Sequence, residues 1–453
     1  MADHRAARRQ TLQGRVGPGD PDWVYVPVEL PPATARLTVH LGYDRSLGVV
    51  DLGLFGPAGR FRGWSGGAHG AFTVAAGDAT PGYFAGPLPP GTWHVVLGPY
   101  RVPVEGLPWR LEVEAGTDGG PPAGVATAAA SPLGPPGDRV LRGAPGWYRG
   151  DLHVHTLYSD GAFTPAEALA LARFAGLDFL VTSEHNTSAG HQAFAREQRP
   201  DLLLIAGEEV TTRAGHAGAV GLRPGRWVDW RYRPEDGVLP GIAAELRAEG
   251  VLLQANHPFS AGRGTGWRFG WEVVEAVEVW NGSEPAAVND RAVALWDRLL
   301  RDGRRLVATG GSDAHRPPDQ VGQPHTVVWA ERLAVAEVVA GLRAGRCWLA
   351  RSAGIGLDFA ATAGDRRAGV GERLGGRRGQ AVGVRLRVTG APGAIASVHG
   401  RDGTARADGL GPGASGTLEF ETVLGTTPWL RAEVRQPDGA LVALTNPIWL
   451  ATA

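Results

Sequence analysis

Apolar and polar residues alternate with a period of two near both ends of the chain. The run "ARLTVHLGY" places Leu37, Val39 and Leu41 on one face of an extended segment, and "PWRLEVEAG" and "AVGVRLRV" repeat the pattern. Such alternation between clusters of glycine and proline is typical of half-buried strands. We therefore predict an N-terminal β-sandwich-like domain over residues 1–115 and a C-terminal one over residues 353–453.

The middle of the chain, residues 147–352, has short apolar runs separated by stretches with helical periodicity. The runs include "DFLVTS", "DLLLIAGEEV", "VLLQANHP" and "RRLVATGG". One intervening stretch, "TPAEALALARFAG", predicts a helix with Thr164 as N-cap, Glu167 completing a capping box and Gly176 ending it. Successive strand–helix units indicate parallel strands. The expected fold class is α/β, with a β/α barrel flanked by the two β domains.

The segments outside these domains suggest a linker and no targeting signal. Residues 116–146 are rich in proline, glycine and alanine and lack periodicity, so we interpret them as a linker. The start of the chain, "MADHRAARRQTLQGRV", is polar, unlike a signal peptide. No apolar run reaches the roughly 18 residues that a membrane-spanning helix needs. We therefore expect a cytoplasmic protein with no membrane partner.

Composition narrows the classes of function. The 453 residues carry a formal net charge of −1, without the basic surplus typical of nucleic-acid-binding proteins, so we expect no nucleic-acid partner. The chain has no lysine, which excludes Schiff-base catalysis through a lysine side chain. The single cysteine, Cys347, lies where a predicted helix leads into a strand, and we interpret it as a core residue.

Histidines and carboxylates gather where the predicted middle strands end. Eight of the 13 histidines lie between residues 153 and 325. In chain order the polar stretches are "HVH", "SDG", "SEHN", "GEEV", "GH", "NHP" and "GSDAH". The carboxyl ends of barrel strands face one mouth, so these residues would converge. Side chains at i and i+2 of a strand share a face, which aims His153 with His155, and Asp313 with His315, into the same space.

This set of side chains suits divalent cations. Imidazole and carboxylate ligands are typical of zinc, manganese and iron sites. A site with this many ligands holds more than one ion, so we predict two or three divalent metal ions (Zn, Mn or Fe) as cofactors. The alternative is a structural role at the strand ends, and for Asp160 a turn before Gly161.

The ordered motifs resemble the PHP (polymerase and histidinol phosphatase) metallohydrolase superfamily. The flanking segments, and the phrase "LTNPIWL" near the C-terminus, are most similar to its CehA/McbA-like family, whose name includes carbaryl hydrolases. The resemblance in the motifs covers residues 150 to about 320 and is specific, because seven motifs occur in register. It implies a distorted β/α barrel that holds up to three metal ions.

Carried over onto this sequence, the resemblance implies three overlapping sets of metal ligands. The first is His153, His155, Glu209 and Asp313; the second shares Glu209 and adds His216 and His257; the third is Asp160, His185 and His315. The family motif has glycine, one apolar residue and then glutamate. Here Glu208 occupies the apolar position, so the choice between Glu208 and Glu209 stays open.

Further residues near the motifs are candidates for orienting the ligands or contacting substrate. They are Glu184, Asn186, Glu208, Asn256 and Asn281. The family usually has aspartate where Glu184 stands. Asp313, His315 and Arg316 form the candidate catalytic set, in which Arg316 either binds a substrate phosphate or is a solvated charge.

Several residues near the predicted site have competing explanations. His191 and His325 match no motif, and we expect them at the surface, with a place at the mouth of the site as the alternative for either. Four tryptophans in the predicted loops form an aromatic rim or pack between domains: Trp227, Trp230, Trp267 and Trp271. "GWSGG" around Ser65 matches the nucleophile-elbow pattern, but no helix follows it, so we interpret it as a β-turn.

Three functions fit these features. The first hypothesis is a metal-dependent phosphoesterase that acts on a small molecule through a metal-bound hydroxide. The second is a carbamate, ester or amide hydrolase with the same centre. The third is a non-catalytic protein that binds a ligand or glycan, which the complete ligand set disfavours. The sequence does not indicate the natural substrate or the oligomeric state.

Overall fold

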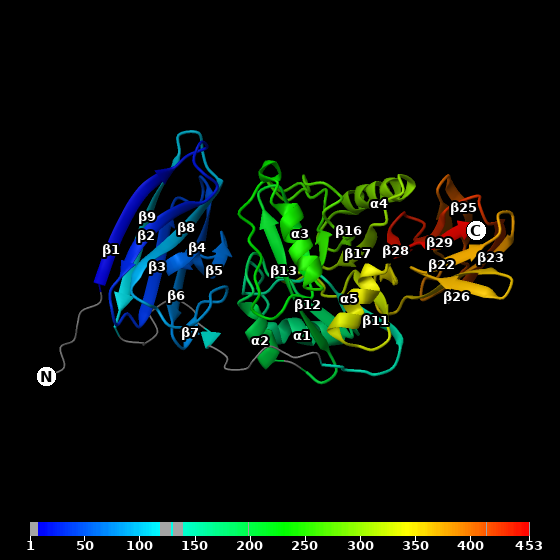
Figure 1. Ribbon diagram of the computed structural model, residues 1–453, viewed down its shortest axis with the longest axis horizontal. Helices are drawn as coiled ribbons and strands as arrows, with labels where there is room; N and C mark the ends of the chain where they lie inside the picture. The colour runs from blue at the N-terminus through cyan, green and yellow to red at the C-terminus, as the bar shows by residue number, and fades with distance from the viewer. Residues whose placement is uncertain (1–7, 118–127, 130–138, 198, 414, 453) are drawn as a thin grey trace.

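The computed structural model arranges the chain as three regions along the long axis of the molecule (Figure 1). N-terminal strands lie at one end, a mixed region with all the described α-helices follows, and C-terminal strands lie at the other end. The structure describes residues 8–117, 128–129, 139–197, 199–413 and 415–452. Much of the predicted linker (118–127 and 130–138) and residues 1–7 of the predicted polar N-terminus lie outside the described residues. The predicted α/β class is confirmed.

Two β-sheets enclose the core of the N-terminal region, in the orders β1-β9-β3-β6-β7-β10 and β2-β8-β4-β5. The strands are β1 (Arg8–Val16), β2 (Val24–Leu30), β3 (Arg36–Tyr43), β4 (Val49–Gly56), β5 (Arg60–Gly66), β6 (Ala71–Ala75), β7 (Asp78–Ala79), β8 (Gly91–Arg101), β9 (Leu107–Gly116) and β10 (Ala128–Ala129), with the 3-10 turn η1 (Pro57–Gly59). Leu37 and Val39 of β3 pack in one core with Leu52 and Leu54 of β4. The predicted alternation therefore selects the buried face of β3.

Seven strands of the middle region lie in the spatial order β17-β16-β15-β14-β13-β12-β11. They are β11 (Gly146–Asp151), β12 (Phe179–Thr182), β13 (Leu203–Thr212), β14 (Gly215–Val220), β15 (Leu252–Ala255), β16 (Ala276–Asn281) and β17 (Val307–Gly311). Just beyond the ends of β11 and β17, Val154 and Ala314 form a parallel bridge, which joins the two sides of this set.

The expectation of parallel strands is wrong at β14, which is antiparallel to both β13 and β15. Only residues 213–214 separate β13 from β14. A parallel neighbour needs a crossover of a dozen or more residues, so this short connection makes a hairpin.

Helices accompany the middle strands: α1 (Pro165–Phe174), α2 (Gly190–Arg196), α3 (Leu239–Ala248), α4 (Ala286–Arg301) and α5 (Val335–Arg343), with the 3-10 turn η2 (Pro234–Asp236). The capping box predicted for α1 is confirmed, because Thr164 accepts from the Glu167 N–H and the Glu167 carboxylate accepts from the Thr164 N–H. Gly176 follows the helix with a φ of 73°. None of the described helices is long and apolar enough to cross a membrane.

The C-terminal region continues the middle sheet without interruption, in the order β11-β18-β19-β28-β27-β24-β25. A second sheet, β21-β20-β23-β26, covers it, and β22 pairs with β29. The last two strands of the middle region are β18 (His325–Ala330) and β19 (Cys347–Ala350). The C-terminal strands are β20 (Gly356–Ala363), β21 (Arg366–Gly369), β22 (Arg373–Gly376), β23 (Ala381–Thr389), β24 (Ile395–Gly400), β25 (Gly403–Gly409), β26 (Ser415–Val423), β27 (Trp429–Arg435), β28 (Leu441–Thr445) and β29 (Ile448–Thr452).

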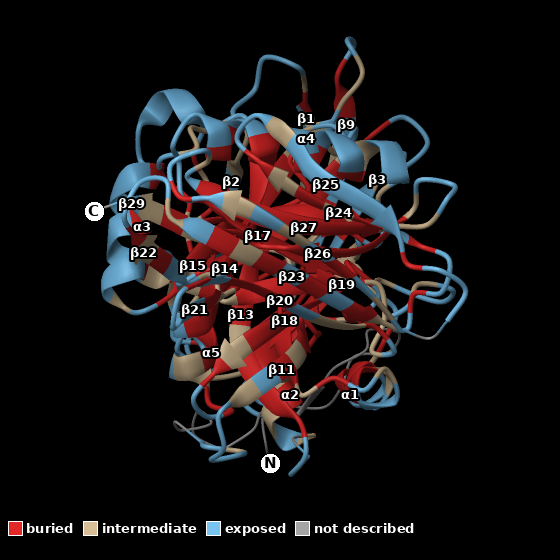
Figure 2. Cartoon of the chain, turned by 90° about the vertical axis from the view of Figure 1, so that its right-hand side faces the viewer, coloured by how far each residue is buried: buried red, intermediate tan, exposed pale blue. Residues whose placement is uncertain are grey.

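The view along the long axis shows buried residues along the central strands and exposed residues on the outer helices and loops (Figure 2). Cys347 lies in this core at the start of β19, and burial raises the pKa of its thiol to about 12. The thiol is therefore protonated at neutral pH and packs as an apolar side chain, as predicted.

Candidate metal centre

The histidine motifs meet at one end of the middle strands. The first and last motifs are held side by side by the backbone, because the Asp313 N–H donates to the His153 carbonyl at 2.7 Å and the His155 N–H donates to the Ala314 carbonyl at 2.9 Å. The rings of His153 and His155 lie 5.1 Å apart. The two histidines of "HVH" thus face the same space.

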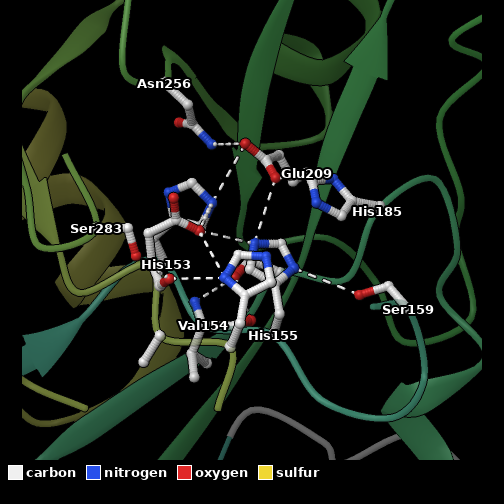
Figure 3. A network of polar contacts seen from close by, with 12 residues as sticks. His153, Val154, His155, Ser159, His185, Glu209, Asn256 and Ser283 are labelled. Atoms are coloured by element: carbon white, nitrogen blue, oxygen red, sulfur yellow. Dashed lines mark hydrogen bonds and ion pairs between the residues drawn. The ribbon is translucent and has the colours of Figure 1, made fainter. Parts of the chain in front are cut away.

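Glu209 is the carboxylate around which most of the histidines gather (Figure 3). Its oxygens lie within 3.4 Å of five imidazoles: His185 Nδ1 at 2.9 Å, His257 Nε2 at 3.0 Å, His153 Nε2 at 3.2 Å, His216 Nδ1 at 3.3 Å and His155 Nε2 at 3.4 Å. Burial alone would raise the pKa of Glu209, but the surrounding histidines hold it well below its usual range. Glu209 is therefore ionised and central.

Glu208 lies on the opposite face of β13. Its carboxylate accepts a hydrogen bond from the Val228 N–H at 3.1 Å, and burial raises its pKa well above the usual range. Adjacent residues of a strand alternate between faces, so only one of the two glutamates can face the histidines. The structure brings Glu209 to the cluster and separates Glu208 from it, so the orienting or substrate role predicted for Glu208 has no support in its contacts.

Asp313 is the second buried carboxylate of the cluster. Its Oδ1 lies 3.1 Å from His155 Nε2 and 3.3 Å from His153 Nε2, and its Oδ2 accepts from the Asn281 side-chain amide at 3.1 Å. Burial opposes ionisation of Asp313, but the adjacent histidines hold its pKa well below the usual range. Asp313 and Glu209 thus place two negative charges against His153 and His155.

Asp160 marks the open side of the cluster. Its Oδ1 lies 3.3 Å from His315 Nε2 and 3.6 Å from His185 Nε2. The side chains of Asp160, His315 and His185 are 43%, 23% and 20% exposed, whereas His153, His155 and Glu209 are fully buried. The cluster is therefore open on the side of Asp160.

The carboxylates give the cluster negative charge that nearby cations would neutralise. Burial favours a neutral imidazole, but Asp313 and Glu209 raise the pKa of His153 well above its usual value. Against the same effect of burial, Asp160 and Glu209 raise the pKa of His185 to about 9. Either protons on the histidines or bound metal cations can neutralise the carboxylates.

The residues present fit divalent cations. Four groups have ligand atoms close enough to share an ion: His155, Asp160, His185 and His315; His153, His155 and Glu209; His153, His257 and Asp313; and His185, Glu209 and His216. Four of the buried ligand atoms make no hydrogen bond within the described chain: His153 Nε2, His155 Nε2, Asp160 Oδ1 and Glu209 Oε2. Each of these atoms lies within 3.4 Å of an oppositely charged neighbour but without hydrogen-bond geometry, which is consistent with ligation of a shared cation.

One group contains the whole third expected ligand set, whereas the first and second sets are divided differently, because Asp313 groups with His153 and His257 and not with His155 and Glu209. His216 groups with His185 and Glu209, whereas His257 groups with His153 and Asp313. A single carboxylate with five histidine neighbours can be shared in several ways. His216 and His257 both lie against Glu209 Oε1, at 3.3 and 3.0 Å, and the expected set of these three residues stays a prediction.

Glu278 is a residue that sequence reasoning missed. Its Oε1 lies 3.0 Å from His153 Nδ1, and its Oε2 accepts from the His257 N–H at 2.9 Å and the Asn281 amide at 3.0 Å. A carboxylate at Nδ1 fixes that nitrogen as the donor, which leaves Nε2 of His153 free for a cation. The signal was a lone acidic residue inside the apolar strand "AVEVW".

Asp151, just before the first motif, was missed as well. Its buried carboxylate accepts from the backbone N–H groups of Ser312 at 2.9 Å, Gly322 at 2.7 Å and His153 at 3.1 Å. These bonds tie the ends of β11 and β17 together. A Cβ on the adjacent Gly311 would lie 2.6 Å from the Cβ of His153, so that close approach requires glycine.

The predicted supporting residues have distinct contacts. Asn256 donates to Glu209 at 2.9 Å, and Asn281 to Asp313 at 3.1 Å. Asn186 pairs with the backbone of Thr211 beside His185. The Glu184 carboxylate accepts from the Thr156 N–H at 3.2 Å, from the Thr156 hydroxyl, and from the Ser159 hydroxyl at 2.5 Å, and the Glu184 carbonyl accepts from the Glu209 N–H at 3.1 Å.

The backbone at the cluster is strained. Asn186, His257 and Asp313 have φ values of 54°, 25° and 51°. Non-glycine residues rarely adopt positive φ, and such residues concentrate at functional sites because the surrounding contacts must hold them. This strain accompanies three of the segments that converge here.

Arg316 and the two unmatched histidines end up in different environments. Arg316 is exposed at the open side and donates to the Asp160 carbonyl at 2.8 Å. The expectation that His191 and His325 are at the surface is wrong, because both are buried. Their rings bond to the carbonyls of Gly207 at 2.8 Å and Gly322 at 2.9 Å.

Ser65 lies within β5 and not in the expected β-turn. Its hydroxyl lies 3.0 Å from the Tyr83 hydroxyl and 3.3 Å from the Leu52 carbonyl, and among the described residues no histidine forms a hydrogen bond with it. The dismissal of a nucleophile elbow agrees with this strand geometry, because that motif requires a strand-to-helix turn.

Comparison with known proteins gives one family match over a short segment and two remote structural similarities. Residues 298–347 match a family described as PHP-associated. A search of the curated proteins gives no match. A two-domain protein from Bacteroides vulgatus ATCC 8482, containing a predicted PHP-like metal-dependent phosphoesterase, is 18% identical, with a TM-score of 0.37 over 71% of this chain and 100% of that chain. An amidohydrolase from Chromobacterium violaceum, with bound sulfate and no metal, is 17% identical, with a TM-score of 0.30 over 38% of this chain and 89% of that chain.

Proposed function

We propose that the protein is a metal-dependent hydrolase of the PHP type that cleaves a phosphoester in a small molecule. The observation that carries this proposal is the convergence of nine histidine, aspartate and glutamate side chains, with buried ligand atoms that lack hydrogen bonds within the described chain. The match of residues 298–347 to a PHP-associated family supports it, because that segment includes the "GSDAH" motif. We assign the ring of strands from β11 to β17 to the distorted PHP barrel, and the CehA/McbA-like branch stays a prediction.

The cluster residues have two roles: some would bind the cations, and others lie at the open side, where the substrate would bind. When bound, divalent ions at such a site supply a hydroxide at neutral pH and polarise the substrate's phosphoryl or carbonyl oxygen. Glu209 and Asp313 hold the buried side of the centre, and Glu278 keeps Nε2 of His153 directed at them. His315 is fixed in the same way, since its Nδ1 lies 2.8 Å from the Asp313 carbonyl, which leaves Nε2 at the open side.

A phosphoester fits the charge at the open side. Arg316 reaches this edge with one of its N–H groups on the Asp160 carbonyl, and the rest of its guanidinium is exposed. An arginine fork beside a cation centre matches a phosphate with several anionic oxygens. We therefore assign Arg316 to binding the substrate phosphate.

A carbamate, ester or amide is the second candidate. A cavity of about 420 Å³ beside the cluster is lined in part by Trp23, Val49 and Trp64. These apolar surfaces suit an uncharged ester at least as well as a phosphate.

Hydrolysis of p-nitrophenyl phosphate and p-nitrophenyl acetate by manganese- or zinc-loaded protein, with and without chelator, tests the proposal. Chelator-sensitive release of nitrophenol from the phosphate supports a phosphoesterase, and release from the acetate alone supports the second candidate. Metal content measured by mass spectrometry, together with no turnover of either compound, would contradict hydrolysis while leaving metal binding intact.

A further inference from the structure

The N-terminal region packs against the middle region next to the open side of the cluster. Trp230 of the middle region is fully buried, and its ring centroid lies 4.8 Å from Trp64, 5.5 Å from Phe61 and 6.2 Å from Trp23. We predicted that Trp230 either forms part of an aromatic rim or packs between domains, and its contacts support packing between domains. The interface is an aromatic core, so the N-terminal region is fixed in place beside the site.

The cavity of about 420 Å³ lies at this junction. On one side its lining includes Asp160, His185 and His216 of the cluster, and on the other Trp23 and Trp64 of the N-terminal region. A substrate whose reacting group lies at the cluster must therefore extend along the N-terminal region.

A second cavity, of about 310 Å³, adjoins the first. Both are lined by Tyr100 and Arg213, and neighbouring residues divide between them: Trp23 and Thr265 line the first, and Asp22 and Gly264 line the second. Four arginines line the second cavity: Arg213, Arg233, Arg263 and Arg268. Only two acidic residues, Asp22 and Glu235, line it with them.

Two of these arginines already have acidic partners. Arg233 binds Asp22 through two hydrogen bonds of 2.6 and 2.7 Å, and Arg213 pairs with Asp51 at 2.9 Å. The pKa of Asp22 is lowered first by the hydrogen bond from Arg233, and further by the charges of Arg213 and Arg263. Asp22 is thus surrounded by more positive charge than it can neutralise.

The side chains of Arg263 and Arg268 form no hydrogen bond or ion pair with the described residues, and both are exposed. Their loop is anchored at the junction, since the Arg268 N–H donates to the Ala214 carbonyl at 2.9 Å and the Tyr100 hydroxyl bonds to the Arg263 carbonyl. Two uncompensated guanidinium groups therefore project at a concave surface whose backbone is held.

Arg213 stands rigidly between the two cavities. Its guanidinium carbon lies 4.6 Å from the Trp23 ring centre and 4.9 Å from that of Tyr100, and Asp51 holds its terminal nitrogen. Gly98 permits this packing, because a Cβ there would lie 2.8 Å from both Arg213 and Trp23. A planar cation held between two aromatic rings keeps its orientation at low entropic cost.

We propose that the 310 Å³ cavity is an anion subsite, which binds a carboxylate or phosphate group of the substrate while the reacting group lies at the metal cluster. The inference rests on the proposed function, because the subsite is defined by its position beside that cluster. Arg263 and Arg268 bind the anion, and Arg213 separates it from the reacting centre. The substrate class is a small molecule with a second anionic group remote from the bond that is cleaved.

Calorimetric binding of phosphonate probes tests the subsite without turnover. The probes are alkylphosphonates and the ω-carboxyalkylphosphonates of the same chain lengths, from two to six carbons, added to manganese-loaded full-length protein. For the best chain length we expect the carboxylate to tighten binding at least about tenfold, and this gain falls as salt screens the exposed arginines. In R263A/R268A we expect the ratio of the dissociation constants of the alkylphosphonate and the matching ω-carboxyalkylphosphonate to drop to about one.

The matched control is R377A/R378A, which removes two exposed arginines of the C-terminal region. In this variant we expect the ratio of the two dissociation constants to equal that of the wild type. If alkylphosphonates bind but the carboxylate adds nothing at any length, or if R263A/R268A keeps the full ratio, the subsite is refuted while the metal centre stands. If neither probe series binds, the phosphoesterase proposal is refuted, and the subsite with it. Tighter binding of ω-phosphonoalkylphosphonates than of the carboxylates would identify the second anion as phosphate.

Discussion

The two flanking β regions have the same period-two sequence pattern but are attached to the middle region in different ways. The N-terminal region meets it through aromatic side chains around Trp230 and lines the cavity beside the cluster. The C-terminal region shares a sheet with it, because β28 pairs with β19, and the Asn446 side chain bonds to both the N–H and the carbonyl of Ala308 in β17. At the N-terminal junction, side-chain contact leaves a cavity that reaches the cluster residues, whereas at the C-terminal junction a continuous backbone ladder joins the two regions. We therefore expect the N-terminal junction to control substrate binding and the C-terminal junction to control stability.

Removing a ligand of the cluster should affect neither junction and produce the largest change in activity. In His155→Ala we expect hydrolysis to fall at least about a thousandfold, because transition-state charge loses several kcal/mol of stabilisation. Activity of metal-loaded protein and its thermal unfolding measure the two effects. The control is His40→Ala, an exposed histidine of the N-terminal region. Wild-type turnover by His155→Ala would refute the assignment of the centre.

Two buried tryptophans allow a matched test of the junctions. Trp230→Ala removes the centre of the N-terminal interface, and Trp429→Ala removes a side chain buried on the C-terminal side. Each should lower the free energy of unfolding by about 3–5 kcal/mol, because a large cavity is created. Only Trp230→Ala should also raise KM, since it loosens the wall of the substrate cavity. Equal changes in KM for the two variants would contradict the proposal that only the N-terminal junction controls substrate binding.

The C-terminal junction contains a buried ion pair whose loss should destabilise without changing KM. Arg431 binds Asp297 at 2.9 Å and Glu433 at 2.8 Å, and all three side chains are buried. Arg431→Met leaves two buried carboxylates without that partner, so we expect a loss of about 3 kcal/mol in chemical unfolding. Arg406→Ala breaks an exposed pair with Asp408 and should cost less than about 1 kcal/mol. A similar small loss for Arg431→Met would show that the junction does not depend on this pair.

Glu433 should give the same junction a modest pH dependence. Burial alone would raise its pKa, but Arg431 and Arg435 lower it from 4.5 to about 2. The folded state then binds fewer protons than the unfolded state, so the stabilisation is complete above pH 4.5 and is lost as pH falls toward 2. We expect Glu433→Gln to be about 3 kcal/mol less stable than wild type at pH 7, with the gap closing between pH 4.5 and 2. A gap that stays constant over this range would contradict the shift.

Local patterns in the sequence identified much of what forms the site. The capping box of Thr164 and Glu167 sets the start of α1, and alternation along β3 sets its buried face. All nine ligand residues that the resemblance to the PHP motifs implied lie in the cluster groups. Residue spacing alone accounts for His153 lying with His155 and for Asp313 lying with His315. The antiparallel β14 was missed because a two-residue connection leaves little periodic signal.

Only the tertiary structure decided which carboxylates face the histidine cluster and which make other contacts. The alternation of β13 allows one glutamate to face the histidines, but its phase is fixed by packing, and packing turns Glu209 inward and Glu208 toward Val228. Glu278 and Asp151 are distant from their partners in sequence and were invisible to local reasoning. The same holds for the pairing of Arg213 with Asp51 and for the placing of the N-terminal region at the mouth. Sequence periodicity reports which face of an element is buried; which other element covers that face depends on long-range packing, and at this site that packing brings the groups together.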